Sequence, residues 1–302
     1  MIVYSLLSVT LAFAALSIWL LLQYGNKYSN RSALYPILPL SMAVFIYLFG
    51  TWVFLSIFLK QLFAIVFLVT LMRTVVKKQN KKLSAPLRIL PIIFILLFSL
   101  MSVLYFTGTA GTPFGIIDLA MPFKKGTYFV FQGGKGLPTN LFHYTGRRTP
   151  YAMDIIKLNK YGNRADAIFS TQLADYEIFG DTIYSSCSGT ILTTETDNPD
   201  NIPPNRKRGP TNLNRVLVET ATAYVFMGHL KQGSVLVKAG DKVSVGQPIG
   251  LVGNSGMTLE PHLHIQVHAK TTADLPWYRQ PQLLIQFNGK EYLLFEEIIA
   301  DK

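Results

Sequence analysis

The chain has 302 residues, half of them hydrophobic, and a formal net charge of +11 at pH 7. This length suits one or two domains. Nine of the 28 Lys and Arg residues precede Asp118, the first acidic residue, and the other 19 face all 17 acids. The later part therefore lacks the concentrated basic stripe that nucleic-acid binding needs, and we expect no nucleic-acid partner. The single Cys187 excludes an intramolecular disulfide and a cysteine-rich zinc module.

The N-terminal part is predicted to cross a membrane about four times. Apolar segments cover about Ile2–Gln23 and Ile89–Phe106, and the stretch 33–76 between them is nearly continuous, broken by Lys60 and Gln61. A membrane-crossing helix needs about 20 apolar residues, so this stretch fits two helices. A cleaved signal peptide is the alternative for the first segment, which lacks the positive n-region and short apolar h-region of such signals.

Basic loops predict the orientation of these helices. Lys27 and Arg31 follow the first segment, and six more Lys and Arg residues lie within 73–88, between the third and fourth segments. Because loops rich in Lys and Arg favour the cytoplasmic side, both loops are expected there. Everything after Thr107 is then outside the cytoplasm. A docking site for anionic lipids is the alternative function of the basic run 77–82.

The rest of the chain is predicted to be mainly β, with an antiparallel sheet. Short alternating runs bounded by Gly, Pro, Asn and Asp indicate many strands. We expect a membrane region over 1–106, a linker over 107–125 and one β-rich domain over 126–302. The polar stretch 196–214 predicts a loop, either the rim of a cleft or a solvated hairpin. The clearest strands are Tyr128–Gln132, Tyr151–Lys157, Gly189–Glu195, Arg215–Glu219, Tyr224–Met227 and His264–His268.

All five histidines lie in this β-rich part, and His262 and His264 form the strongest signal. Alternate side chains of a strand share a face, so the two imidazoles are expected about 6.6 Å apart on one side. This is too far for two tight ligands of one zinc ion unless the strand bends. One is therefore predicted to bind a metal and the other to reach its water or the substrate. His268 has the same parity and is expected at an exposed strand position.

A catalytic zinc ion takes three protein ligands and keeps one position open. His143 is a candidate for one of the remaining ligands. Asp154 is a candidate for the other, because it lies in an apolar strand where an unpaired carboxylate would be costly. The alternative for Asp154 is a salt bridge to Arg147, Arg148 or Lys157.

The absence of three common motifs excludes several classes of enzyme. The sequence has no HExxH motif, no GxSxG motif and no P-loop. Without the helix-borne glutamate of thermolysin-like enzymes, acid–base work at a zinc site falls to histidine, whose pKa suits it near neutrality. His229, near the end of a predicted strand, is the unassigned candidate.

Three linked motifs are similar to those of the lysostaphin or LytM-type zinc metalloendopeptidases, peptidase family M23. They are GHL at 228–230, VKAGDKVSVGQPIGLVGNSG at 237–256 and EPHLHIQV at 260–267. The resemblance runs from about Gly126 to Lys270. Better-known members place their first His and Asp ligands three residues apart, whereas eleven positions separate His143 from Asp154. This spacing resembles the subgroup with an Asn and a His before a loop that ends in Tyr-Ala-x-Asp.

The resemblance implies one Zn²⁺ per chain, held by His143, Asp154 and His264. It implies that His229 and His262 are catalytic and act on the water and the oxyanion. The implied substrate is peptidoglycan, cut in its stem or cross-bridge peptides. The implied place is the bacterial cytoplasmic membrane, with several spans in the lipid bilayer and the peptidase domain on the extracytoplasmic side.

Two other classes of protein compete with this interpretation. A catalytically inactive LytM-like module would bind the wall or regulate other wall hydrolases, but such members typically lose ligands, and here all five positions are filled. A lipoyl- or biotinyl-like β module shares the glycine-punctuated hairpin pattern. It predicts a lysine in a tight exposed turn and gives no reason for the histidines and Asp154.

Overall fold

The computed structural model describes residues 2–27, 34–76, 89–147, 149–204 and 212–301. The chain divides into two compact units. One contains residues 1–104 with 161–163, and the other contains residues 105–160 with 164–302.

Four apolar helices form most of the first unit: α1 (Ile2–Lys27), α2 (Leu34–Phe49), α3 (Ile57–Val76) and α4 (Ile89–Thr107). Three of them, α1, α3 and α4, are long and apolar enough to cross a membrane, whereas α2 has only 16 residues. Between 11% and 28% of each long segment is buried inside the protein. Most of their apolar side chains therefore face outward, as they do in lipid-spanning helices. The expected apolar helical region is confirmed.

The sequence suggested that the break between α2 and α3 lies at Lys60 and Gln61, and this is wrong. It lies at residues 50–56, where the short 3-10 helix η1 (Trp52–Phe54) is buried and the Trp52 indole donates to the Ile46 carbonyl at 3.0 Å. Lys60 lies inside α3, with its ammonium 4.5 Å from the centre of the Tyr47 ring. A lysine with a long apolar stem can lie along an apolar helix without ending it.

The predicted orientation depends mostly on residues that the structure does not describe. Arg73 is the one basic residue of the two loops whose side chain lies within the described part. The sidedness of the helices therefore stays a prediction.

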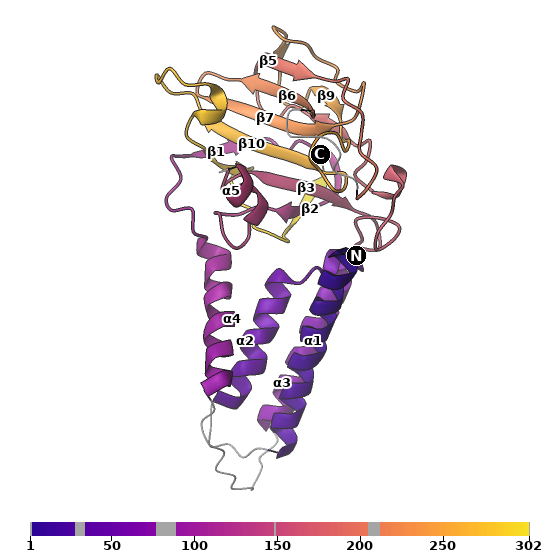
Figure 1. Ribbon diagram of the computed structural model, residues 1–302, viewed down its shortest axis with the longest axis vertical. Helices are drawn as coiled ribbons and strands as arrows, with labels where there is room; N and C mark the ends of the chain where they lie inside the picture. Colours follow the sequence, from indigo (N-terminus) through magenta and orange to yellow (C-terminus); the bar gives the residue numbers. More distant parts are fainter. Residues whose placement is uncertain (1, 28–33, 77–88, 148, 205–211, 302) are drawn as a thin grey trace. The chain divides into compact units, whose positions relative to one another are not determined.

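The second unit is built on an eight-stranded antiparallel sheet (Figure 1). In spatial order its strands are β12 (Glu297–Asp301), β2 (Lys125–Gln132), β3 (Met153–Leu158), β10 (Leu263–Ala269), β7 (Ala223–Leu230), β6 (Asn214–Glu219), β5 (Gly189–Glu195) and β8 (Lys242–Val243). Two small sheets accompany it. They pair β4 (Thr182–Tyr184) with β9 (Pro248–Leu251), and β1 (Ile116–Leu119) with β11 (Leu284–Phe287).

The two faces of the central strands differ in chemistry. Along β10, Leu263, Ile265 and Val267 point into the main hydrophobic core. The alternate residues, His264 among them, point to the other face. Because β10 is paired on both sides, by β3 and β7, its backbone is fixed and its polar face is held in one register.

All six predicted strands correspond to observed strands, which confirms the β-rich, antiparallel class. Residues 107–125, predicted as a linker, contain β1, which pairs in parallel with β11. The described part of 196–214 is anchored at one point: Asp200 forms a bridge with Ser255, and the backbone amide of Asn254 donates to the Asp200 carboxylate at 2.6 Å. This loop therefore packs on the segment that precedes the His262–His264 motif.

Candidate metal centre

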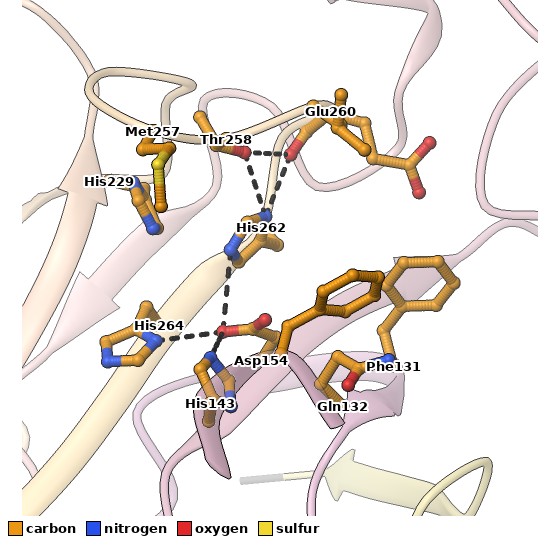
Figure 2. Close-up of a pocket in the computed structure, with 12 residues that line it drawn as sticks. Phe131, Gln132, His143, Asp154, His229, Met257, Thr258, Glu260, His262 and His264 are labelled. Atoms are coloured by element: carbon orange, nitrogen blue, oxygen red, sulfur yellow. Dashed lines mark hydrogen bonds and ion pairs between the residues drawn. The ribbon is translucent and has the colours of Figure 1, made fainter. Parts of the chain in front are cut away.

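Three of the predicted site residues meet between the sheet and a short helix. Asp154 on β3 and His264 on β10 are register partners, and His143 comes from α5 (Leu141–Arg147). Their ligand atoms all lie within 4.8 Å of one another, and all three residues are buried. His264 Nδ1 is 2.9 Å and His143 Nε2 is 3.2 Å from Asp154 Oδ1 (Figure 2).

His262 reaches the same carboxylate from outside the strand. It lies immediately before β10, and its Nε2 is 3.5 Å from Asp154 Oδ1. His262 therefore lies outside the strand, and the 6.6 Å offset expected from the even spacing of a regular strand does not apply to it.

His229 completes the group through a local distortion of β7. The register between β6 and β7 shifts so that His229 has no partner between Gly228 and Leu230, and its backbone adopts φ 65°. A bulge of this kind redirects a side chain. The His229 and His262 rings are 4.6 Å apart. The residue before His229 must be glycine, because a Cβ at Gly228 would lie 2.8 Å from the Phe226 ring.

The tautomer of His143 follows from its neighbour Asn140. The Asn140 amide nitrogen donates to the carbonyls of Pro150 and Ala152, at 2.9 and 2.8 Å, which turns its oxygen toward His143. That oxygen can only accept, so His143 Nδ1 donates to it at 2.7 Å. Neutral His143 then carries its lone pair on Nε2, the nitrogen that faces Asp154. Metal-binding histidines are commonly oriented in this way.

Backbone carbonyls fix two further histidines. His229 Nδ1 lies 2.7 Å from the Ser255 carbonyl, and His262 Nδ1 lies 2.8 Å from the Glu260 carbonyl. Since a carbonyl only accepts, both Nδ1 atoms donate and both Nε2 atoms carry lone pairs when the rings are neutral. The carboxylate of Glu260 is itself fixed by Arg164, whose Nε and Nη2 donate to it at 2.8 and 2.9 Å.

The donor set fits a divalent cation. Asp154 Oδ1 is approached by ring nitrogens of His143, His262 and His264, within 2.9–3.5 Å. A single proton can relieve the repulsion between only one nitrogen and the oxygen, whereas a dication can attract all of these atoms at once. Two imidazole nitrogens and a carboxylate oxygen are also ligands that zinc prefers.

Burial and neighbouring charges set the titration of these groups. Burial alone raises the pKa of Asp154, but when the neighbouring rings are protonated, the charges of His143 and His262 and the ring N–H groups of His143 and His264 hold that pKa well below its usual range. Burial, reinforced by His262 and His264, lowers the pKa of His229 far below that of free histidine. Burial also lowers the pKa of His264, against the opposing hydrogen bond to Asp154. His229 and His264 are therefore neutral at neutral pH, as metal binding and proton acceptance require.

A cleft opens onto this cluster. Its lining comprises the five predicted site residues and a mostly apolar wall: Phe131, Gln132, Phe142, Met257, Thr258, Leu259 and Glu260. Phe142, Met257 and Leu259 are exposed. The cleft can therefore hold an extended segment of chain against apolar side chains while one of its bonds faces the histidines.

Two expectations about individual residues are corrected. His268 is not exposed: it is 2% accessible and donates from Nδ1 to the Gln280 carbonyl at 2.7 Å. Among the alternative partners of Asp154, Lys157 instead pairs with Asp181 at 2.9 Å. The side chains of the other two, Arg147 and Arg148, lie outside the described residues.

The residues that orient the histidines were not predicted. Ser255 and Glu260 act through backbone carbonyls, which carry no signal in the residue type. The Asn of the His…Tyr-Ala-x-Asp pattern was a usable signal, because Asn140 is the side chain that fixes His143.

Residues 172–276 match the model of peptidase family M23. This confirms the predicted resemblance over that range, which lies within the β-rich unit. The range includes His229, His262 and His264. It begins after His143 and Asp154, the two residues whose spacing departs from that of the better-known members.

Similar proteins match over short segments. The chain is 42% identical over 72 residues to a protein named "Uncharacterized metalloprotease" from Buchnera aphidicola, a match that covers 24% of this chain and 19% of that protein. It is 33% identical over 88 residues to peptidoglycan DD-endopeptidase ShyA of Vibrio cholerae, covering 29% and 17%. The chain thus spans less than a fifth of either relative. A crystal structure of a zinc-containing peptidase from Vibrio cholerae matches with 27% identity and a TM-score of 0.24, covering 34% of this chain and 29% of that one.

Proposed function

We propose that this chain, with its M23 domain, is a membrane-anchored zinc metalloendopeptidase that hydrolyses peptide bonds of bacterial peptidoglycan outside the cytoplasmic membrane. One observation carries the proposal: ring nitrogens of His143, His262 and His264 converge on one oxygen of Asp154, with the Nε2 lone pairs of neutral His143 and His262 aimed at it. His229 lines the same cleft. A purely structural cluster would place hydrogen-bond donors opposite these acceptors.

His143, Asp154 and His264 are assigned as the ligands of one zinc ion. When bound, zinc supplies Lewis acidity and lowers the pKa of a coordinated water toward about 7. His262 and His229 are assigned to proton transfer. Their Nδ1 atoms are held by carbonyls, so each offers Nε2 as a proton acceptor beside the ligands. Having accepted a proton, the same nitrogen can donate to a developing oxyanion or to a leaving amine.

The substrate is proposed from the cleft and the relatives together. The apolar wall suits an extended peptide with small or apolar side chains better than it suits a sugar or a nucleotide. One relative is a peptidoglycan endopeptidase. Stem or cross-bridge peptides of peptidoglycan are the substrate class that satisfies both. Apolar helices that precede an M23 match in the chain suit an enzyme that stays at the membrane and works on the adjacent wall.

The proposal is tested on the full chain purified in detergent. We expect about one zinc ion per chain, and new amino termini when isolated cell walls are incubated with the protein and the fragments are analysed by mass spectrometry. Chelation should abolish the digestion, and zinc should restore it. Stoichiometric zinc without new termini would contradict the enzyme and favour the inactive module that binds the wall or regulates other hydrolases.

Sidedness is tested separately with reporter fusions. A reporter after Lys302 should behave as extracytoplasmic and one near Asn80 as cytoplasmic, because the basic segment 73–88 is expected inside. A cytoplasmic signal from the Lys302 fusion would contradict both the orientation and the wall substrate.

A further inference from the structure

A chain of buried polar groups runs away from the metal centre along β10. His264, Gln266 and His268 alternate along the strand and share its polar face. His264 Nε2 lies 3.0 Å from Gln266 Oε1, and Gln266 Nε2 lies 3.3 Å from His268 Nε2. Gln266 and His268 are not among the residues that line the cleft, so neither is placed to touch a substrate.

The proton positions in this chain follow from its far end. His268 Nδ1 lies 2.7 Å from the Gln280 carbonyl, which only accepts, so Nδ1 carries a proton. His268 is buried, and its ring is kept in place by an edge-on contact with Trp277 at 5.5 Å. A neutral ring with a proton on Nδ1 has an acceptor at Nε2. Two amide nitrogens approach that acceptor, from Gln266 at 3.3 Å and from Gln282 at 3.4 Å.

This acceptor decides which way the Gln266 amide points. Its nitrogen faces His268, so its oxygen faces His264 Nε2 and receives a proton from it. The lone pair of His264 is then on Nδ1, next to Asp154. With the amide reversed, His264 would carry its proton on Nδ1. That proton would bond to the Asp154 carboxylate and occupy the place of a metal ion.

We propose that Gln266 and His268 are positioning residues that set the tautomer of His264 and thereby expose its Nδ1 to the metal. The proposal deepens the function proposed above and rests on its zinc site. The Gln280 carbonyl fixes the tautomer of His268, His268 fixes the orientation of the Gln266 amide, and that amide fixes the tautomer of His264. Partners of this kind typically change metal affinity by about 10- to 100-fold when removed.

The first test compares His268→Phe and Gln266→Leu with Gln282→Leu in the full chain. Gln282 is the matched control, because it approaches the same nitrogen of His268 and is not bonded to His264. Zinc affinity, measured by competition with a chelator, should fall about 10- to 100-fold in the first two variants and stay at the wild-type value in the control. Equal losses in all three variants would mean that the residues only support the fold.

The second test observes the tautomer without metal. With only five histidines, selective ¹⁵N labelling gives few signals, and each ring reports which nitrogen carries its proton. At pH 8 the metal-free wild-type chain should show His264 with its proton on Nε2, and His268→Phe should shift the population toward Nδ1. An unchanged His264 tautomer in His268→Phe would overturn the proposal.

A rescue separates positioning from packing. In Gln266→Glu both carboxylate oxygens accept, so His264 Nε2 stays protonated whatever faces the other side. Adding His268→Phe to that variant should cost no further zinc affinity, whereas the same change in the wild type should. Equal costs in both backgrounds would contradict the proposal. A wild-type chain that binds no zinc would instead contradict the metal site, and the tautomer populations would still decide the role of His268.

Discussion

The ligands proposed on the sheet, Asp154 and His264, and the one proposed on a helix, His143, are held by different kinds of contact. Asp154 and His264 are register partners on neighbouring strands, and the strand pairs on either side fix their backbones. His143 lies on a helix of seven residues, which has little stability of its own. It is positioned by the side chain of Asn140 and by the Thr149 amide, which donates to its carbonyl at 3.0 Å.

Neither kind of support fixes how many residues must separate the ligands along the sequence. Once two strands are in register, the separation of their side chains is set by the sheet and does not depend on loop length. A ligand on a short helix can be brought to the same place by loops of different length, provided that a local bond orients it. The eleven positions between His143 and Asp154 are therefore compatible with a centre that the better-known members of family M23 build with a separation of three.

Removing a strand-borne ligand should have the largest effect. In Asp154→Ala the remaining histidines keep their tautomers but lose the anionic ligand, so we expect no stoichiometric zinc and no wall digestion. Metal analysis and digestion of isolated walls provide the measurement. Asp181→Asn is the matched control, since that carboxylate bonds to Lys157 and Tyr128 away from the cleft and should leave zinc content unchanged. Full zinc in Asp154→Ala would contradict the ligand assignment.

Removing the proposed proton carriers should affect turnover and spare the metal. His262→Ala and His229→Ala are expected to retain zinc and to lower kcat by about 10²–10³-fold each. The double variant should lose less than the product, because both residues serve one transition state. Zinc content beside digestion rate distinguishes the roles. If His262→Ala lost its zinc, ligand and catalyst would have to be exchanged between His262 and His264.

A smaller effect is expected from the contact that orients the helix-borne ligand. Asn140→Leu removes the acceptor that holds His143 Nδ1, and zinc affinity should fall about 10- to 100-fold. His143→Ala should cost more, because it removes the ligand itself. Thr145→Val is a control within the same helix: its hydroxyl donates to the Leu141 carbonyl at 2.7 Å. Affinity unchanged by Asn140→Leu would show that the loop alone fixes His143.

The smallest expected effect is on the stability of the metal-free fold in acid. Burial lowers the pKa of His268, partly opposed by its bond to the Gln280 carbonyl. The unfolded chain, with a histidine pKa of about 6.5, therefore takes up the proton first as pH falls. The free energy of unfolding should be constant above about pH 7.5. Below that it should decrease by about 1.4 kcal/mol for each pH unit between the two pKa values.

Denaturant titrations between pH 8 and pH 5 measure this slope. His268→Gln should flatten it, since the proton-binding group is gone. A slope that is unchanged in His268→Gln would assign the acid sensitivity to other groups, with buried His229, whose pKa is also lowered, as the first candidate.

Periodicity and motifs were sufficient to predict the apolar helices, the strands and the residues that meet at the cleft. That Asp154 needs a partner could be predicted, because an unpaired carboxylate in an apolar strand is costly, but the strand alone did not decide between a metal ion and a salt bridge. The break before α3 could not be predicted, because it depends on the packing of Trp52 rather than on the nearest polar residues. The burial of His268 could not either, since it follows from the loop that contains Gln280. The orienting carbonyls belong to the backbone and become visible only in three dimensions.

The left-handed backbone of His229 links the stability of this protein to its proposed activity. A residue with a side chain in that conformation costs about 1–2 kcal/mol of folding free energy, and glycine avoids the cost. Random variation selected for thermal resistance alone would therefore tend to replace His229 with glycine or asparagine. Such a protein would tolerate heat better and would lack one of its two proposed proton carriers. At this position, sequences drifting under selection for robustness and sequences kept under selection for catalysis should diverge.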